Sequence, residues 1–436
     1  MTILKIGVAV AVGLVLVCGL LLLAALNSLN SLREPPFDPP EVAPLGKRPP
    51  FEADRIAKTA AGYVLAGVVG ASDPLRGRPC SGRFALLFLD NRGRPTRAAV
   101  LSGPERSRYC AERVDALVSW TERGWFVAGT GVRDGGPEPL FGGRSTDSLP
   151  VTFRLDASGA LVKSFGDGGV VEGHRAAGRV DGAMFTTRLE RITERGSIRD
   201  DLVFYTPPFP SWGSFEVDDA LLVAIDYGPD LTFQTFERDA PAVVAYRPLH
   251  SMSPEPTVEL GTNFGVGDTL LRDGVMYVAV RDRAGTRLHA VDPRRLRILR
   301  GFGVRGAVRL PGQTTSTELM FDGANRLVVA TTTIDRGHEG ERLHVLRFAA
   351  DGSPDAEFGG RVRRKGCDVL MNHGIDDALV DAAGRTLVLG GESTLVRLDP
   401  SGAPDMTFGD GGVVQLQRLG LCELPPARRA NACRGP

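Results

Sequence analysis

The sequence predicts an all-β fold made of repeated units. In three places an apolar strand ends in a short polar turn, and a Phe-Gly pair follows six residues after the turn glycine. The three pairs are Phe165-Gly166, Phe358-Gly359 and Phe408-Gly409. Weaker copies begin at Leu86 and at Leu288. Repetition of this kind is typical of an array in which each unit buries its apolar face only against its neighbours.

A second repeated element is an apolar strand that begins at a glycine or an asparagine. Its copies are Gly62–Gly67, Gly124–Gly129, Asn325–Ala330 and Gly384–Gly390. Together with the turn and the Phe-Gly pair, these strands resemble the delta-60 repeat family, over roughly Asp54 to Leu419, although the likeness fades between Val171 and Leu260. The resemblance implies a β-propeller, and it names no ligand and no reaction.

Each unit contains four short apolar runs separated by turn residues, which is typical of antiparallel β units. We refer to the four strands of a unit as A to D. Second strands are expected near Tyr63, Trp125, Leu202, Val275, Leu327 and Thr386, which gives six units. The long third unit offers two candidate third strands, Leu221–Ile225 and Ala242–Ala245, so seven units are the alternative.

The Phe-Gly segments fall between strands C and D. Glycine permits the positive φ of a tight turn there, and the phenylalanine can fill the gap between adjacent blades. A calcium loop is the alternative because of Asp167 and Asp410, but the ligand spacing of such loops is missing.

The first fifty residues predict a membrane anchor and a stalk. Ile6 to Leu26 is apolar and uncharged, and a helix of that length spans the ~30 Å hydrocarbon core. Retention is favoured over cleavage as a signal peptide because no clean cleavage site follows. Lys5 favours a cytoplasmic N-terminus. The expected domains are residues 1–26 as anchor, 27–50 as proline-rich linker, 51–420 as propeller and 421–436 as tail.

The charge balance excludes some classes of function. Fifty-two basic residues match fifty-two acidic residues, so no net field draws the chain to nucleic acid. Local arginine density is nevertheless high in two segments. They contain Arg294, Arg295, Arg297, Arg300, Arg305 and Arg309, then Arg361, Arg363, Arg364 and Lys365. These side chains could contact an anionic glycan or lipid head group, or could form a solvated blade edge.

Long connections between strands B and C should gather on one face of the repeat array. Such insertions commonly form the binding face of repeat proteins. Four aromatic residues in these connections are candidates for stacking on a sugar or anchoring a protein, namely Phe141, Phe209, Trp212 and Phe215. The alternative is that they pack beneath their own loops.

An acidic residue lies near the start of strand A in each of the six units. The set is Asp54, Asp115, Asp181, Asp268, Glu318 and Asp377. Because strand A is innermost in a propeller, these carboxylates could ring the channel and hold Ca²⁺, which would be the only cofactor. Otherwise, each carboxylate accepts hydrogen bonds from the backbone of its own D–A turn.

Five cysteines lie outside the predicted anchor, where disulfides can form if they face an oxidising compartment. We expect Cys80 to pair with Cys110, and Cys422 with Cys433. Cys367 is then unpaired, although it could instead capture either tail cysteine.

The sequence shows no zinc pair, nucleophile elbow or phosphate loop. It therefore predicts a membrane-anchored, extracytoplasmic, non-catalytic scaffold that binds an envelope protein or glycan. The alternatives are a hydrolase or lyase of cell-envelope polysaccharide, which would use channel carboxylates, and a structural spacer without a ligand.

Overall fold

A computed structural model describes the chain in residues 51–70, 82–101, 109–119, 124–133, 148–174, 176–180, 183–186, 191–193, 195–199, 212–218, 221–226, 232–237, 260, 265–282, 285–293, 295, 297–334, 341–358, 367–371, 374–416 and 429–430. For some of these only the backbone is described. The described residues all belong to one compact unit, within residues 49–436. No helix of the described residues is long and apolar enough to cross a bilayer, and Ile6–Leu26 lies outside them.

The described strands form seven sheets, numbered here 1 to 7 in chain order, and nearly all neighbouring strands are antiparallel. Sheet 1 contains β1 (Phe51–Lys58), β2 (Gly62–Val69), β3 (Arg83–Asp90) and β4 (Pro95–Leu101). Sheet 2 contains β5 (Tyr109–Ser119), β6 (Gly124–Arg133), β7 (Ser148–Asp156) and β8 (Val170–Glu172). Sheet 3 contains β9 (Ala176–Val180), β10 (Ala183–Thr186), β11 (Arg191–Ile192) and β12 (Ile198–Arg199).

The remaining sheets follow the same order. Sheet 4 contains β13 (Trp212–Asp218), β14 (Leu221–Asp226) and β15 (Thr232–Glu237). Sheet 5 contains β16 (Gly265–Arg272), β17 (Val275–Asp282), β18 (Gly285–Asp292), β19 (Arg297–Ile298) and β20 (Ala307–Arg309). Sheet 6 contains β21 (Thr314–Phe321), β22 (Leu327–Ile334), β23 (Glu341–Phe348) and β24 (Cys367–Met371). Sheet 7 contains β25 (Ile375–Val380), β26 (Thr386–Gly390), the short 3₁₀ segment η4 (Gly391–Ser393), β27 (Thr394–Leu398) and β28 (Val413–Gln415).

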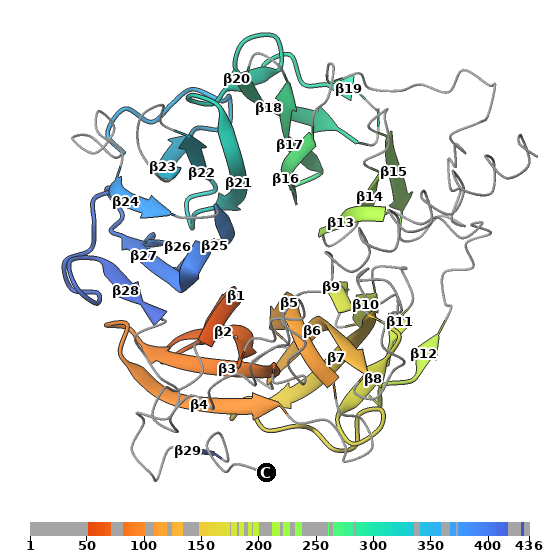
Figure 1. The fold of residues 1–436 in the computed structure, drawn as a ribbon. Helices are drawn as coiled ribbons and strands as arrows, with labels where there is room; N and C mark the ends of the chain where they lie inside the picture. Colours follow the sequence, from red (N-terminus) through yellow and green to blue (C-terminus); the bar gives the residue numbers. More distant parts are fainter. Residues whose placement is uncertain are drawn as a thin grey trace, which may run out of the picture. The chain divides into compact units, whose positions relative to one another are not determined.

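The first strand of every sheet contacts the first strand of the next sheet. The contacts run from β1 through β5, β9, β13, β16, β21 and β25, and β25 also contacts β1. The ring of inner strands is therefore closed, and the sheets follow one another around it in chain order, as the colours of Figure 1 show. This is the arrangement of a β-propeller. In addition, β29 (Arg429–Ala430), from the expected tail, pairs in parallel with the outer strand β4 of sheet 1.

Five of the six expected second strands are confirmed, as β2, β6, β17, β22 and β26. Leu202 lies outside the described residues. The long third unit instead supplies two separate sheets, because β9 to β12 pair only with one another and β13 to β15 pair only with one another. Leu221–Ile225 lies in β14 and is thus a second strand, not a third. The described residues therefore form seven sheets, whereas the sequence predicts six units. The difference arises because the stretch with the weakest repeat contains two short sheets in place of one.

The core lies in layers between neighbouring sheets. One cluster joins the first and last sheets, and it packs Phe51, Tyr63 and Leu87 against Leu389 and Phe408. Similar clusters join sheets 1 and 2, sheets 5 and 6, and sheets 6 and 7. Burial of apolar surface between sheets is what stabilises a repeat array whose single units have no enclosed core.

The Phe-Gly pairs of sheets 2, 5 and 7 each join their sheet to the next one. Phe408 of sheet 7 is fully buried and lies edge-on to Tyr63 of sheet 1, and the next residue, Gly409, donates its N–H to the Arg92 carbonyl at 3.0 Å. In the same way Gly166 donates to Arg195, and Gly303 to Asp351, each in the following sheet. The expected structural role of the pair is therefore confirmed.

The glycine of this pair cannot be replaced without strain. Gly166, Gly303 and Gly409 have φ between 52° and 57°, in the left-handed region that favours glycine. A Cβ atom at Gly409 would lie 2.2 Å from the Val413 carbonyl oxygen, and the other two glycines face the same clash. This explains why glycine recurs at the position.

A buried arginine lies eleven residues before the phenylalanine in two of the repeats with described contacts. Arg397 stacks on Phe408 with 4.2 Å from its guanidinium carbon to the ring centre, forms an ion pair with Asp405 at 2.9 Å, and donates to the Asn91 carbonyl of sheet 1. Arg347 stacks on Phe358, pairs with Asp355 at 2.8 Å, and donates to the Pro400 carbonyl of sheet 7 at 3.0 Å. The repeat thus places one charge pair at each of these two sheet junctions.

Candidate functional site

The predicted channel carboxylates lie within the inner strands and not at their first residues. Asp54 in β1, Asp115 in β5 and Asp268 in β16 each fall at an irregularity in the strand pairing. A β-bulge leaves one residue out of the ladder and re-aims its side chain. Asp377 in β25 follows a comparable irregularity. Asp181 lies outside the described residues.

Three of these carboxylates join one inner strand to the next through the backbone. Asp54 accepts a hydrogen bond from the N–H of Val114 in β5 at 2.7 Å. Asp268 accepts from Leu319 in β21 at 2.6 Å, and Asp377 accepts from Ile56 in β1 at 2.8 Å. The expectation that each carboxylate binds its own D–A turn is therefore wrong for these three bonds, because the bulge turns the side chain toward the neighbouring strand.

Arg55 provides the positive charge of this cluster. Its Nε donates to the Asp115 carbonyl at 2.8 Å, and its Nη1 donates to the carbonyls of Asp54 at 2.8 Å and Asp376 at 2.5 Å. One guanidinium thereby bonds the inner strands of sheets 1, 2 and 7. Asp115 accepts from Thr130 at 2.8 Å and pairs with Arg113 at 2.7 Å.

Burial raises the pKa of these carboxyls. Burial raises the pKa of Asp54 to about 7 and that of Asp268 to about 7, despite the backbone N–H donors that lower each. Burial raises the pKa of Asp377 to about 6, with Arg55 opposing the shift. The pKa of Glu318 is raised well above its usual range, first by burial and then by the nearby charges of Asp268 and Asp377.

This cluster binds backbone groups, and nothing in the described residues groups three or more His, Cys, Asp or Glu side chains in a way that could hold a metal ion. Protonated carboxyls donate hydrogen bonds as well as accept them, so they suit uncharged polar groups. The calcium hypothesis therefore gains no geometric support among the described residues.

A polar pocket opens beside Glu318 at the B–C end of sheets 5 and 6. Its volume is about 160 Å³, roughly five water molecules at ~30 Å³ each. It is lined by Arg281, Thr286, Thr314, Thr315, Ser316, Thr317, Glu318 and Ile375. We call it the hydroxyl pocket. Arg281 lies one residue before the end of strand B of sheet 5, and Thr286 is the second residue of its strand C. Thr314–Thr317 begins strand A of sheet 6, which places the pocket at this end of the sheets.

The hydroxyl groups around the pocket are held by one another. Thr315 donates to the Glu341 carboxylate at 2.6 Å and lies 2.7 Å from the Thr332 hydroxyl. Ser316 lies 2.6 Å from Thr332 and accepts from the N–H of Ile375 at 2.8 Å. Each hydroxyl can donate and accept, so a bound hydroxyl group can join the network without leaving a polar atom unpaired.

Sequence reasoning missed this pocket, although its signal was visible. Thr314-Thr-Ser-Thr317 and Thr331-Thr-Thr333 are runs of hydroxyl residues at the start of one strand and the end of the next. In an antiparallel pair these two ends meet, and Thr317 does pair with Thr331. Threonine is common in strands for its β-branched shape, which hides such a signal.

Two of the four predicted aromatic residues lie in a strand. Trp212 and Phe215 lie in strand β13, so their assignment to a B–C loop is wrong. The segment Trp212–Asp218 pairs with β14 over its length, which a loop would not do. Phe141 and Phe209 lie outside the described residues, and so do the side chains of Trp212 and Phe215.

The disulfide predictions stay predictions. Cys80, Cys422 and Cys433 lie outside the described residues. Cys110 is in β5 and Cys367 is in β24, and for these two cysteines only the backbone is described.

Comparison with known families supports the fold. A family model described as a domain of unknown function (DUF5122) beta-propeller matches residues 325–358 and 385–408, which lie in sheets 6 and 7. No curated protein sequence matches the chain significantly.

Solved structures with a similar fold have low sequence identity to this chain. The WD40 beta propeller domain of Doa1 is 12% identical with a TM-score of 0.41, covering 80% of this chain and 93% of that domain. The computationally designed Ika8 protein is 11% identical with a TM-score of 0.43, covering 84% and 89%. A puromycin-hydrolyzing peptidase of Mycobacterium tuberculosis is 13% identical with a TM-score of 0.43, covering 88% of this chain and 55% of the peptidase.

Proposed function

We propose that this chain is a membrane-anchored, extracytoplasmic propeller of seven blades that binds a glycan and catalyses no reaction. The observation that carries the proposal is the hydroxyl pocket, where five Ser and Thr residues, one arginine and one buried carboxyl converge at the B–C end. Sugars are recognised through many hydroxyl groups that both donate and accept, which is the chemistry that this pocket offers.

The position of the pocket agrees with the role of the B–C end. One long B–C connection begins and ends at this end of sheet 6, since Ile334 and Glu341 flank it on strands β22 and β23, and Glu341 bonds the pocket residue Thr315. Insertions of repeat proteins commonly form the binding face. A pocket of about 160 Å³ suits one sugar ring.

The anchor and the repeat family complete the proposal. Ile6 to Leu26 provides a span of membrane length, and the prolines of residues 27–50 favour an extended linker. The strand and Phe-Gly motifs support a delta-60 repeat, and the seven sheets support seven blades.

Binding of full-length protein to an array of neutral and acidic cell-envelope oligosaccharides tests the function. Arg281→Gln and Thr315→Val should each weaken a positive signal, together by at least tenfold, because each removes one hydrogen-bonding group worth about 1 kcal/mol. Arg94→Gln and Thr96→Val, in sheet 1, are the matched controls and should not change it. If both pocket variants bind the array as strongly as the parent protein does, the glycan does not bind at the hydroxyl pocket.

A hydrolase is the second candidate, because one observation favours it. Glu318 lines the pocket and has a pKa raised well above its usual range, which suits a general acid. Release of reducing ends from an array-positive glycan, abolished by Glu318→Gln with binding retained, would establish this alternative. Binding without release supports the scaffold, and an array without signals would favour the spacer.

A further inference from the structure

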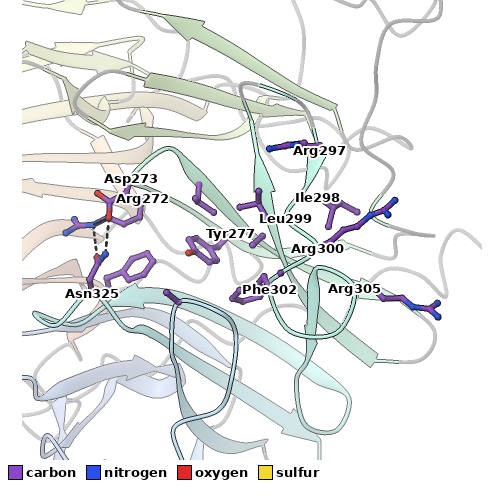
Figure 2. A pocket seen from close by; sticks show the side chains of 15 residues that line it. Arg272, Asp273, Tyr277, Arg297, Ile298, Leu299, Arg300, Phe302, Arg305 and Asn325 are labelled. Atoms are coloured by element: carbon purple, nitrogen blue, oxygen red, sulfur yellow. Dashed lines mark hydrogen bonds and ion pairs between the residues drawn. The ribbon is translucent and has the colours of Figure 1, made fainter.

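The junction of sheets 5 and 6 departs from the repeat and contains a cavity of about 1390 Å³. The cavity lies at the end of the sheets opposite the hydroxyl pocket. It is lined by the A–B turns and the C–D segment, from Arg272 and Asp273 to Leu299, Phe302 and Asn325 (Figure 2).

We attribute the cavity to the replacement of two residues that form an ion pair in sheets 6 and 7. In sheets 6 and 7 the N–H of Asp355 or Asp405 donates to the carbonyl of Arg347 or Arg397, and the side chains form an ion pair. In sheet 5 the same backbone bond joins Leu299 to Ala290, at 2.8 Å. Ala290 and Leu299 therefore stand at the positions of the arginine and the aspartate.

The replacement changes both the volume and the polarity of the junction. Arg347 and Arg397 are 8% and 1% exposed, so at the junctions that follow sheets 6 and 7 a guanidinium fills the space beside the phenylalanine. In sheet 5 only the methyl group of Ala290 stands at the position of the arginine side chain. The space beside it is lined by Phe302, Tyr277 and Leu299. The cavity floor is thus apolar where the repeat is ionic.

The rim of the cavity is positively charged. Four arginines line it, Arg272, Arg297, Arg300 and Arg305, against one carboxylate, Asp273. Arg272 donates to Asn325 at 3.2 Å, and Arg297 lies 3.7 Å from Asp292. Within the described part of the chain, Arg300 and Arg305 have no ion-pair partner, and both are exposed. In Figure 2 they lie on the side opposite Arg272.

We propose that this cavity binds an anionic amphiphile, a molecule with an apolar chain and a terminal phosphate or carboxylate. The apolar chain would lie against Phe302, Tyr277 and Leu299, and the head group would be held by Arg300 and Arg305. Ligand pockets are largely apolar with a few convergent polar groups, and arginine binds phosphate and carboxylate through paired N–H donors. The site is separate from the proposed glycan site and does not depend on it.

Calorimetric titration of the full-length protein in a non-ionic detergent tests the site. The probes are octyl phosphate, octanoate, octyltrimethylammonium and inorganic phosphate. Octyl phosphate or octanoate should bind saturably, and at least tenfold more tightly than the cationic amphiphile or phosphate alone. All variants share residues 1–50, which contain the expected anchor. Partition of a given probe into the detergent is therefore the same for every variant, and differences between variants report binding to the protein.

Two variants and a control locate the binding. Ala290→Arg with Leu299→Asp restores the ion pair of the repeat and should abolish binding by filling the cavity. Arg300→Glu with Arg305→Glu changes only exposed side chains, should weaken binding of the anionic probes at least tenfold, and decides the matter if the first variant does not fold. Arg94→Glu, in sheet 1, should have no effect. Equal affinity for anionic and cationic amphiphiles, or binding that survives both double variants, would overturn the proposal.

Discussion

Asp377 in the last sheet accepts a hydrogen bond from the backbone N–H of Ile56 in the first sheet, at 2.8 Å. The same bond joins sheet 1 to sheet 2 and sheet 5 to sheet 6, through Asp54 and Asp268. Apart from β29, which pairs with the outer strand β4 of sheet 1, the described strands of each sheet are contiguous in sequence. Closure between the inner parts of the first and last sheets combines the backbone bond from Gly409 to Arg92 with side-chain contacts of Asp377, Tyr63 and Arg397.

Removing the Asp377 carboxyl should open this closure. We expect Asp377→Ala to lower the free energy of unfolding by about 1–3 kcal/mol, because the Ile56 N–H loses its partner in a buried place. Asp377→Asn keeps an acceptor oxygen and should cost less. Urea denaturation measures both, and Asp410→Ala, an exposed aspartate of the same sheet, is the control. Equal losses for the Ala and Asn variants would show that charge matters here more than the hydrogen bond.

The buried carboxyls should make stability depend on pH. The pKa values of Asp54 and Asp268 are about 7, and that of Asp377 is about 6, against 3.8 in an unfolded chain. Between these limits the folded protein holds protons that the unfolded chain has released. The contribution of these groups to stability is therefore complete below about pH 4 and is lost as the pH rises toward 7.

Asp268→Asn tests this sign. The variant cannot ionise, so its free energy of unfolding should fall less steeply between pH 4 and pH 7 than that of the parent protein. Asp381 and Asp405 have lowered pKa values, owing to bonds with Arg385 and Thr407 that oppose the effect of burial. Their contribution is lost below about pH 4, outside the tested range. A parent profile that rises toward pH 7 would refute the assignment.

Substitutions at Gly409 and Gly411, which both follow Phe408, can distinguish the cost of backbone strain from the cost of a steric clash. Gly409 and Gly411 have φ of 54° and 60°, but a Cβ would lie 2.2 Å from the Val413 carbonyl at Gly409 and no closer than 3.7 Å to Met406 at Gly411. Gly411→Ala should cost about 1–2 kcal/mol from the positive φ alone. Gly409→Ala should cost at least about 2 kcal/mol more, measured by thermal unfolding. Similar costs at both positions would mean that the segment shifts freely.

Arg397 should be essential only while Asp405 is charged. Arg397→Met leaves that carboxylate without its ion pair and should lower stability by about 3–5 kcal/mol. Adding Asp405→Leu should recover most of the loss in stability, because sheet 5 has the apolar pair Ala290 and Leu299 at the equivalent positions. Arg295→Met, at a 70% exposed side chain, should change stability by less than about 0.5 kcal/mol. A double variant no more stable than Arg397→Met would show that the Asn91 bond dominates.

Local pattern was sufficient for the strands and turns. Strands begin at Gly62, Gly124, Leu327 and Thr386 as expected, because period and turn residues act over a few neighbours. The Phe-Gly pair was also correctly interpreted, since glycine and phenylalanine each have few roles in a tight, buried turn. The sheet count was harder, because β9 to β12 are two to five residues long and carry almost no periodic signal.

The sequence by itself determined that this protein is a β-repeat array with Phe-Gly junctions, and it singled out the carboxylates of the inner strands. Only the tertiary structure decided which partner each carboxylate binds, since a one-residue bulge turns Asp54 from its own sheet toward Val114, sixty residues away. It alone brought together Thr286 and Ser316, or Ala290 and Asn325, into pockets. Such sites form where neighbouring sheets pack, at positions where the residues of one junction differ from the repeat, and the repeat alone does not specify which side chains meet there.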